Sequence, residues 1–361
     1  MQKQSRIETV LILQGGASLG AYECGVFKTL TKNGIKFDVV AGTSIGAVNA
    51  AIIAGAKNND PANDLENFWL TLAERVTPSF LPDNVRAVWA WIYSATWGNP
   101  NVFTPKWMTP SPDYFLPNTW PYLYDITPLK NSLNQYVDFA KLGDSNRPRL
   151  IVTSTDIQKG EAVTFDSKYV KIDADHVIAS AGYPFYGISW TQLDGRYLWD
   201  GSLLSNTPLR EVIDASPACD KKVYIVNLFP RIHEELPKNM SEVWHRARDI
   251  MHTDKTEHNV RMSKAFSRHL ELLKEMHDVI MHFLDTKQVD KTMKEKIMKI
   301  EPEYHKLATQ RGAIIKEIIR IERKEDSHFL FEDTDFSLAT IKQLIKQGEE
   351  DAENVLQKKR T

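Results

Sequence analysis

The stretch Ala41-Gly42-Thr43-Ser44-Ile45-Gly46-Ala47 contains the pattern Gly-x-Ser-x-Gly and decides how the chain is interpreted. The apolar run 37–41 leading into it is typical of a buried strand, and the small residues after it favour a helix. A strand, a tight turn and a helix in this order predict a nucleophile elbow with Ser44 at the helix N-terminus. Gly42 and Gly46 would relieve crowding in such a turn. The alternative is an ordinary Gly/Ser turn without chemistry.

Composition describes an ordinary globular protein. The chain has 361 residues, of which 42% are hydrophobic and 25% charged, so it can bury a full core and carry an appendage. A formal net charge of −2 gives no indication of nucleic acid as a partner. Cys24 and Cys219 are too few and too far apart to indicate a disulfide framework or a metal cluster.

Neither a signal peptide nor a membrane span is indicated. Residues 1–6 lead directly into an apolar strand, without the apolar core and cleavage site of a signal peptide. The most apolar run, 39–56, is interrupted by glycine and polar residues, which favours a buried strand, turn and helix. We therefore expect a soluble, cytoplasmic protein.

A second glycine-rich segment, Gly15-Gly16-Ala17-Ser18-Leu19-Gly20, lies between an expected strand at 9–14 and an expected helix at 21–33. Such a loop presents backbone N–H groups to an anion. A dinucleotide site would need Gly-x-Gly-x-x-Gly with an acidic residue about twenty positions later. The spacing here is Gly-Gly-x-x-x-Gly, and the next strand leads to Ser44 instead. An oxyanion hole for acyl transfer is the better interpretation.

Together, the segments 15–22 and 42–50 resemble the patatin-like phospholipases. Ala17 stands where that family usually has a third glycine, and Leu19 stands where many members have a basic residue. The resemblance extends over roughly residues 7–230. It implies an α/β fold, a three-layer α/β/α sheet domain with the elbow and the oxyanion loop at its C-terminal edge.

A nucleophilic serine needs a proton acceptor, and two Asp-Gly pairs are candidates. Asp194-Gly195 is flanked by strand residues and is typical of a hairpin turn. Asp200-Gly201 follows a strand end and precedes Asn206-Thr207-Pro208, which resembles the Asp-Gly motif and the downstream Asn-x-Pro of the patatin-like family. The segment Ser180 to Pro184 matches a further family motif.

The resemblance implies a mechanism with two catalytic side chains. Ser44 would attack an ester carbonyl to form an acyl-enzyme, and Asp200 would act as general base and activate the hydrolytic water. The oxyanion donors would be backbone N–H groups of Gly15, Gly16, Ala17 and Ser18. Because a free aspartate titrates near ~3.9, we expect apolar surroundings to raise the pKa of Asp200.

The expected function is hydrolysis of lipid acyl esters, of phospholipase A or lysophospholipase type, without a metal or organic cofactor. The substrate would be a lipid ester at a membrane or micelle surface. Two alternatives remain open. One is a Ser-His-Asp esterase that uses His176 or His233, the histidines that precede the C-terminal tail. The other is a catalytically inactive lipid-binding protein on the same fold.

Two regions lie outside the motifs. Within an expected catalytic domain at 1–236, the insertion 78–125 contains eight prolines and five tryptophans, which exclude long regular elements apart from a short helix near 85–93. We expect it to form a cap or lid over an acyl pocket, or simply to pack on the core. The last core strand is expected at 223–228.

Residues 237–361 are expected to form an α-helical extension, because their apolar residues recur at helical spacing, the isoleucines at 314–319 included. Such amphipathic helices would pack on the preceding domain or on a second copy of the chain, giving a homo-oligomer, or lie on a membrane surface. The histidines of this region are interpreted as surface residues, since their spacing is irregular for metal ligation: His245, His252, His258 and His269.

Overall fold

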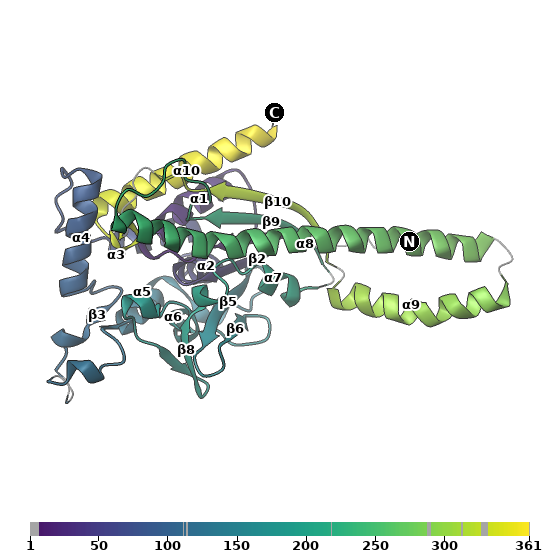
Figure 1. Cartoon of the computed structure of the whole chain (residues 1–361), viewed down its shortest axis with the longest axis horizontal. Helices are drawn as coiled ribbons and strands as arrows, with labels where there is room; N and C mark the ends of the chain where they lie inside the picture. The colour runs from purple at the N-terminus through teal and green to yellow at the C-terminus, as the bar shows by residue number, and fades with distance from the viewer. Residues whose placement is uncertain are drawn as a thin grey trace.

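The computed structural model describes residues 7–110, 112, 115–217, 219–286, 290–311, 313–325 and 331–360. The expectation about a signal peptide concerns residues 1–6, outside these ranges. Figure 1 shows a central sheet with helices on both faces and one long helix, α8, that crosses the sheet and extends beyond it. No described helix is both long enough and apolar enough to cross a membrane.

The central sheet combines a parallel core with an antiparallel side. Its order is β10-β9-β1-β2-β5-β8-β7, and β6 also pairs with β5. The strands from β10 to β5 run parallel, whereas β6, β7 and β8 join by antiparallel pairing. The strand bounds are β1 (Ile7–Leu13), β2 (Val39–Thr43), β5 (Arg149–Asp156), β6 (Glu161–Asp166), β7 (Thr191–Leu193), β8 (Arg196–Asp200), β9 (Asp220–Asn227) and β10 (Ile315–Glu322).

Both faces of the sheet are buried, as expected for parallel strands. Side chains alternate along β1: Leu11 and Leu13 pack into the larger core cluster, and Val10 and Ile12 pack into the smaller one on the opposite face. The larger cluster includes α1 (Gly20–Lys32), α2 (Ile45–Gly55), α3 (Pro61–Leu72), α5 (Thr127–Tyr136), α6 (Ala174–Ile178) and α10 (Leu338–Arg360), and the smaller includes α7 (Leu209–Ala215) and α8 (Met240–Thr286). The predicted three-layer α/β/α fold and the C-terminal helices are confirmed.

The C-terminal region also contains a strand, which corrects two expectations. Residues 314–319 do not form a helix, and the strand at 223–228 is not the last one of the core. Instead, Ile318 and Ile319 lie in β10, which pairs in parallel with β9. β-branched residues favour strands over helices, and this preference prevails over the apparent helical spacing. The proposed boundary at residue 237 thus separates two stretches of chain that share one sheet.

Helix α10 lies directly against α1, and glycines permit this approach. A Cβ atom on Gly25 would lie 1.8 Å from the carbonyl oxygen of Ile345, and one on Gly348 would lie 2.1 Å from that of Tyr22. Both distances are far below a van der Waals contact, and both partners are backbone atoms. Each helix therefore needs a glycine where the other crosses it.

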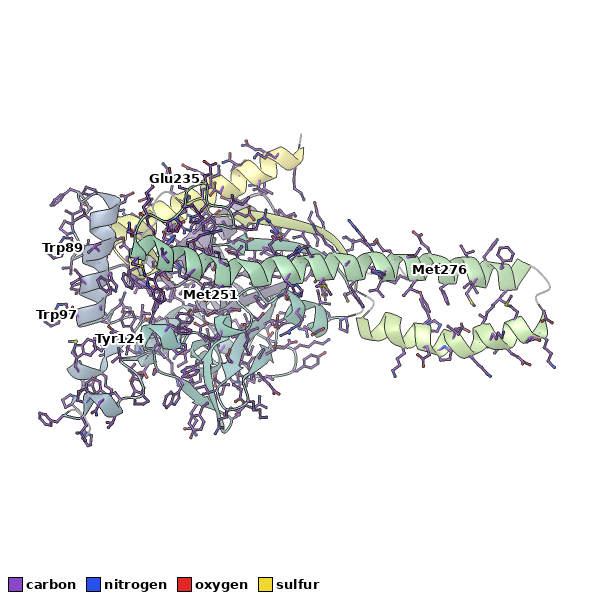
Figure 2. The ribbon with its side chains drawn as sticks, in the orientation of Figure 1. Trp89, Trp97, Tyr124, Glu235, Met251 and Met276 are labelled. Atoms are coloured by element: carbon purple, nitrogen blue, oxygen red, sulfur yellow. The ribbon has the colours of Figure 1, made fainter. Side chains whose placement is uncertain are left out.

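The insertion 78–125 is as irregular as its prolines predict, although its helix is longer than expected. Helix α4 spans Asp83–Trp97, and the other elements are the two-residue strands β3 (Thr104–Pro105) and β4 (Tyr124–Asp125) and the short turns η2 (Lys106–Met108) and η3 (Pro117–Thr119). Figure 2 shows Trp89 and Trp97 on the outer side of α4, where their exposed fractions are 57% and 59%.

Helices α8 and α9 (Lys291–Arg311) form a hairpin that projects from the body (Figure 1). Helix α8 has 47 residues and is therefore about 70 Å long. Its N-terminal half packs on the sheet domain, whereas its C-terminal half extends away from it beside α9. The hairpin and the cavity described below thus depend on opposite ends of one helix.

Candidate active site

Ser44 lies on a sharp turn between β2 and α2. Its backbone has φ +56° and ψ −126°, a conformation that a non-glycine residue rarely adopts. A Cβ atom on Gly42 would lie 2.1 Å from the carbonyl oxygen of Gly46, and one on Gly46 would lie 2.4 Å from that of Leu13. The predicted need for both glycines is confirmed, and the turn has the geometry expected of a nucleophile elbow.

The elbow is anchored by hydroxyl groups from neighbouring segments. The backbone N–H of Ser44 donates a hydrogen bond to Ser180 Oγ at 2.8 Å, and Ser180 Oγ in turn donates to the carbonyl oxygen of Thr153. Thr43 Oγ1 and Thr153 Oγ1 are 2.6 Å apart. Ser180 belongs to the segment 180–184, which matches a family motif but had no role assigned from the sequence. In the structure its hydroxyl group accepts the hydrogen bond that holds the backbone of Ser44.

Asp200 ends β8 and lines the same cavity as Ser44, whose side chain interacts with its carboxyl group. The residue is 1% exposed and also accepts a hydrogen bond from the Ser202 N–H at 2.8 Å. Burial raises the pKa of Asp200 to about 6, and the hydrogen bonds from Ser44 and Ser202 oppose that rise. The shift has the direction that the sequence predicts.

The other Asp-Gly pair forms a turn, as expected. Asp194 and Gly195 have φ values of +50° and +74° and connect β7 to β8. Two consecutive residues with positive φ are typical of a type I′ hairpin turn.

The predicted oxyanion loop follows β1, and the N–H of one of its predicted donors already makes a hydrogen bond within the protein. The Gly15 N–H donates to Asn206 Oδ1 at 3.0 Å, and Asn206 Nδ2 donates back to the Gly15 carbonyl oxygen at 3.3 Å. This pairing removes Gly15 from the predicted donor set and gives Asn206 a positioning role. Ala17 has φ +45°, a left-handed conformation that glycine adopts more readily.

The C-terminal region supports the same loop. Ser18 Oγ donates a hydrogen bond to the carbonyl oxygen of Glu332 at 3.2 Å, which connects η1 (Ala17–Leu19) to η7 (Glu332–Thr334). In the adjacent residue, Asp333 Oδ2 accepts a hydrogen bond from the Tyr186 hydroxyl at 2.7 Å. These contacts had no counterpart in the motifs, because Ser18 and Glu332 are more than 300 residues apart.

A cavity of about 370 Å³ opens in front of Ser44 and Asp200, a volume within the range of small-molecule sites. Its wall is mostly apolar, and its residues come from three parts of the chain. The insertion contributes Trp91, Phe103 and Tyr124, and the C-terminal region contributes His252, Phe331 and Phe336. Trp91 and Phe331 stack with ring centroids 4.3 Å apart, so these two parts meet at the cavity. Such a wall suits an acyl chain.

Neither histidine of the triad alternative lines this cavity. His176 Nδ1 contacts Asp173 Oδ1 at 2.7 Å in a helix capping box, and His233 lies in a buried charged cluster. His252 does line the cavity, and its ring stacks on Phe229 at a centroid distance of 4.8 Å.

The surface assignment of the C-terminal histidines is wrong for His245 and His252, which are 0% and 8% exposed. Both lie on the part of α8 that packs against the sheet domain. The spacing of apolar residues in the sequence did not distinguish this part of the helix from the part that projects. His258 and His269 are exposed, as expected.

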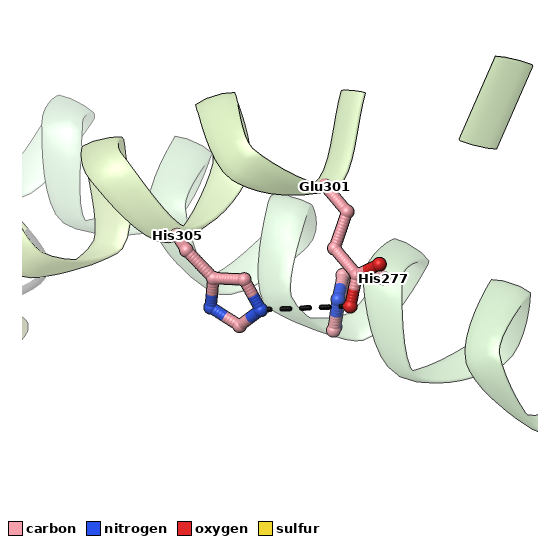
Figure 3. Close-up of side chains that lie close together, drawn as sticks. All are labelled: His277, Glu301 and His305. Carbon is pink, nitrogen blue, oxygen red and sulfur yellow. Dashed lines mark ion pairs between the residues drawn. The ribbon is translucent and has the colours of Figure 1, made fainter. Parts of the chain in front are cut away.

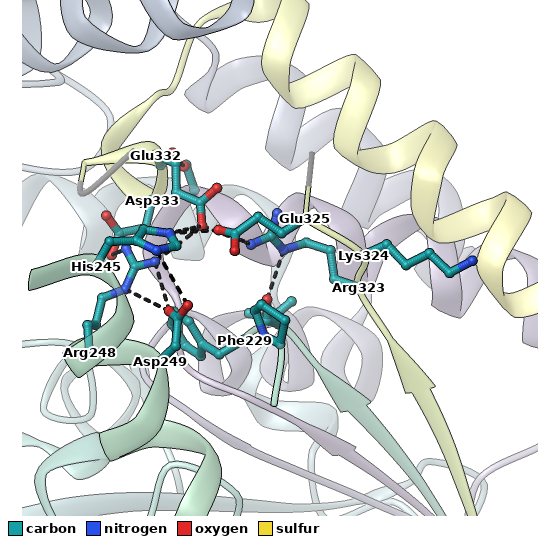
Figure 4. A network of polar contacts seen from close by, with 12 residues as sticks. Phe229, His245, Arg248, Asp249, Arg323, Lys324, Glu325, Glu332 and Asp333 are labelled. Carbon is teal, nitrogen blue, oxygen red and sulfur yellow. Dashed lines mark hydrogen bonds and ion pairs between the residues drawn. The ribbon is translucent and has the colours of Figure 1, made fainter. Parts of the chain in front are cut away.

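Three groups of side chains in the described part of the chain have metal-binding potential, and none includes Ser44 or Asp200. His277, Glu301 and His305 face one another across the hairpin of α8 and α9 (Figure 3). The other two groups are His233, Asp249 and Glu325, and His245, Glu325 and Glu332, which share Glu325. Figure 4 shows His245, Asp249, Glu325 and Glu332 close together. Local spacing gives no sign of these two groups, because Glu325 lies 92 residues after His233 and 80 residues after His245.

The family model described as "Patatin-like phospholipase" matches residues 11–213, more than half of the chain. The chain belongs to the patatin-like phospholipase family. Both Ser44 and Asp200 lie within the matched range, whereas the cavity residues from α8 and from 331–336 lie outside it.

Curated relatives of this patatin-like chain match it over short stretches. A triacylglycerol lipase, SDP1L of Arabidopsis thaliana, is 38% identical over 64 residues, which cover 18% of this chain and 8% of that protein. A patatin-like phospholipase domain-containing protein of Coccidioides immitis (strain RS) is 50% identical over 46 residues, 13% of this chain and 6% of that protein. The chain therefore spans less than a tenth of the length of either relative. Their names denote hydrolysis of lipid esters.

A crystal structure of VipD from Legionella pneumophila is similar over 98% of this chain and 67% of that one, with 13% identity and a TM-score of 0.37.

Proposed function

We propose that this patatin-like protein hydrolyses acyl esters of lipids through Ser44 and Asp200. The observation that carries the proposal is the contact between a strained, glycine-flanked serine and a buried carboxyl group at the head of an apolar cavity. Membership of the family supports the substrate class. The reaction would require no organic cofactor and no catalytic metal.

The geometry supports a two-step mechanism. In its ionised form Asp200 accepts the proton of Ser44 Oγ as this oxygen attacks the ester carbonyl. The N–H groups of Gly16, Ala17 and Ser18 remain as donors for the oxyanion of the tetrahedral intermediate. The protonated Asp200 then returns its proton to the leaving alcohol. In the second step Asp200 activates a water molecule, which hydrolyses the acyl-enzyme.

The specificity proposed is of phospholipase A or lysophospholipase type. The apolar wall suits the acyl chain, and Leu19, where many family members have a basic residue, provides no charge for a head-group phosphate. Any head-group recognition would have to come from other residues at the cavity, such as Arg248.

Lipid analysis tests this proposal. A mixed lipid extract is incubated with wild type and with Ser44→Ala, and the products are identified by mass spectrometry. We expect free fatty acids and lysophospholipids or glycerophosphodiesters only with wild type. Equal fatty-acid release by both proteins would refute the role of Ser44. Failure of wild type to cleave both this extract and a short-chain nitrophenyl ester would support an inactive lipid-binding protein instead.

We further propose that the insertion 78–125 covers the acyl pocket and contacts a lipid surface. Its exposed apolar side chains support this, and they include Phe80 at 85%, Trp97 at 59% and Phe115 at 87% exposure. Trp91 and Tyr124, from the same segment, line the cavity. The segment thus has one side toward the substrate and one toward solvent.

The C-terminal hairpin is the proposed contact with a second copy of the chain. Met276, Val279, Phe283 and Ile300 are each more than half exposed on α8 and α9, an unusual density of apolar side chains for solvated helices. Sedimentation analysis of wild type and Phe283→Lys tests this. A wild type that sediments as a monomer at micromolar concentration would contradict it.

A further inference from the structure

A buried cluster of charged side chains includes Arg248 and Asp333, which also line the cavity (Figure 4). Its members come from the segment after β9, from α8, and from the chain on either side of residues 326–330. They are His233, His245, Arg248, Asp249, Arg323, Glu325, Glu332 and Asp333. The side chains of His233, Asp249 and Glu325 are 9%, 0% and 2% exposed.

We propose that His233 Nε2, Asp249 Oδ2 and Glu325 Oε2 form a binding site for a divalent transition-metal ion such as Zn²⁺. His233 Nε2 lies 3.3 Å from Asp249 Oδ2 and 3.3 Å from Glu325 Oε2. Ligand atoms that bind zinc tetrahedrally at about 2.0–2.1 Å are separated by about 3.3–3.4 Å. The two distances therefore match the edges of a zinc coordination shell, with a fourth position for water or another ligand.

The carboxylates are oriented by contacts through their other oxygens. Asp249 Oδ1 accepts hydrogen bonds from Arg248 Nε and Nη2 at 3.3 and 3.1 Å. Asp249 Oδ2 accepts no hydrogen bond from the described residues, although the side chain has no exposure, and its two contacts are the histidines at 3.3 and 3.5 Å. Glu325 Oε1 lies 2.7 Å from His245 Nε2. Such outer contacts fix ligand orientation at metal sites.

The charges in the cluster also accommodate a divalent cation. Four carboxylates, those of Asp249, Glu325, Glu332 and Asp333, face two guanidinium groups, an excess of two negative charges when both histidines are neutral. Buried charges are costly unless they are balanced. One divalent ion, or two protonated histidines, would restore the balance, and experiment can distinguish the two.

The types of ligand indicate which metal ion would bind and which of the two ligand groups that share Glu325 would bind it. One imidazole with two carboxylates suits Zn²⁺ or Mn²⁺ better than Ca²⁺ or Mg²⁺. The neighbouring group of His245, Glu325 and Glu332 is less suitable, because Glu332 Oε1 already contacts Arg248 at 3.2 Å and Arg323 at 2.8 Å. A cation there would lie beside two positive charges.

The ion would have a structural role. It would join the segment after β9, helix α8 and the segment after β10 at one point. Arg248 and Asp333, which line the cavity, belong to the same cluster. Binding would thus fix the C-terminal wall of the cavity and the Glu332 carbonyl that supports the oxyanion loop. The site takes no part in the ester chemistry, so it stands independently of the proposed function.

Metal binding by the full chain tests the proposal. The protein is freed of metal with a chelator and titrated with Zn²⁺ against a chromophoric competitor, and thermal unfolding is followed with and without the ion. We expect one tight equivalent, a higher Tm with Zn²⁺, and affinity at least about 100-fold weaker in His233→Ala. Co²⁺ added to wild type should give visible absorption bands of a four- or five-coordinate ion, a result that needs no variant.

His305→Ala is the matched control, because it removes a ligand from the hairpin group of Figure 3. We expect it to retain the tight equivalent. Loss of that equivalent in His305→Ala but not in His233→Ala would overturn the proposal in favour of the hairpin. A wild type that binds no Zn²⁺ and unfolds at the same temperature with and without it would also overturn it, and would leave an ion-pair network with protonated histidines.

Discussion

Asp200 combines two properties that oppose each other. In the proposed mechanism it must be ionised to accept a proton from Ser44, yet it is buried at 1% exposure, where an ionised carboxylate is poorly solvated. The result is a pKa of about 6 for Asp200, which leaves the base ionised at neutral pH and closer in basicity to a histidine than to a free aspartate. The proposed mechanism therefore makes both activity and stability depend on pH through the same group.

The first prediction concerns the pH–rate profile. Because the base must be ionised, kcat/KM should rise through about pH 6 and level off above pH 7. An unperturbed histidine titrates near ~6.5, so the profile alone does not identify the base. The variant His252→Phe is the control: its kcat/KM should show the same inflection near pH 6. A pH-independent rate in this variant would show that His252 is the titrating group.

The second prediction concerns stability. The pKa of Asp200 is raised from 3.8 to about 6, so its contribution to stability is present at low pH and is lost as pH rises through 6. Asp200→Asn removes this dependence. Denaturant unfolding should show an inactive variant that is more stable than wild type at pH 8, by on the order of 3 kcal/mol, and similar to it at pH 4. A variant less stable than wild type at pH 8 would contradict the assignment.

A single functional residue can be predicted from the sequence when the strand, turn or helix that positions it is formed by its neighbours in the chain. Ser44 and its flanking glycines are recognisable because strand, turn and helix are adjacent in the chain. Asp200 requires a comparison of two Asp-Gly pairs and the family motif. Arg248 and His252 could not be predicted at the cavity, since their helix has the same amphipathic character where it is buried and where it projects.

At the scale of elements, the contact between α1 and α10 depends on Gly25 and Gly348. Alanine is the better helix former by about 1 kcal/mol, so a glycine within an unobstructed helix would gain stability on replacement. At Gly25 the added Cβ would instead lie 1.8 Å from the carbonyl oxygen of Ile345. Because that oxygen is a backbone atom, the clash could be relieved only by moving α10.

The third prediction follows. Gly25→Ala should lower the free energy of unfolding by more than about 2 kcal/mol, in the range of overpacked cores. Gly143→Ala is the matched control, because a Cβ there meets no atom within 4 Å, and its change should stay within about 0.5 kcal/mol. Equal unfolding midpoints for the two variants in urea would show that α10 does not pack on α1 as described.

Strand β10 shows where sequence periodicity fails. Isoleucines at 314, 315, 318 and 319 fit a helical stripe as well as a short β-branched strand. These residues form a strand and not a helix because they pair in parallel with the edge of β9. That pairing joins residues almost a hundred positions apart, so the local pattern contains no sign of it.

At the scale of the whole molecule, the cavity is built from the patatin-like core, the insertion and the C-terminal region. The fold of the core could be predicted, and so could the position of Ser44 and Asp200, the proposed catalytic pair, beside each other. The cavity wall could not, because the stacking of Trp91 on Phe331 brings together two segments without motifs. Removal of either segment is therefore expected to open the cavity.

The fourth prediction tests the lipid-contacting surface at this scale. Each exposed tryptophan that enters a lipid surface contributes roughly 1.5–3 kcal/mol. The double variant Trp89→Ser, Trp97→Ser should therefore bind phospholipid vesicles at least about tenfold more weakly in co-sedimentation, while hydrolysis of a soluble short-chain ester stays unchanged. Tyr169→Ser, at a position 70% exposed outside the insertion, is the control. Unchanged vesicle binding by the double variant would assign α4 to packing alone.

Covalent labelling of Ser44 tests the central claim most directly. A fluorophosphonate reacts with a serine only when that serine is activated as a nucleophile. After tryptic digestion, peptide 37–57 contains Ser44 as its single serine, so mass spectrometry locates the label without ambiguity. We predict stoichiometric labelling of this peptide in wild type, none in Ser44→Ala, and much slower labelling in Asp200→Asn. A folded wild type in which this peptide stays unlabelled, or is labelled equally fast without Asp200, would contradict the account.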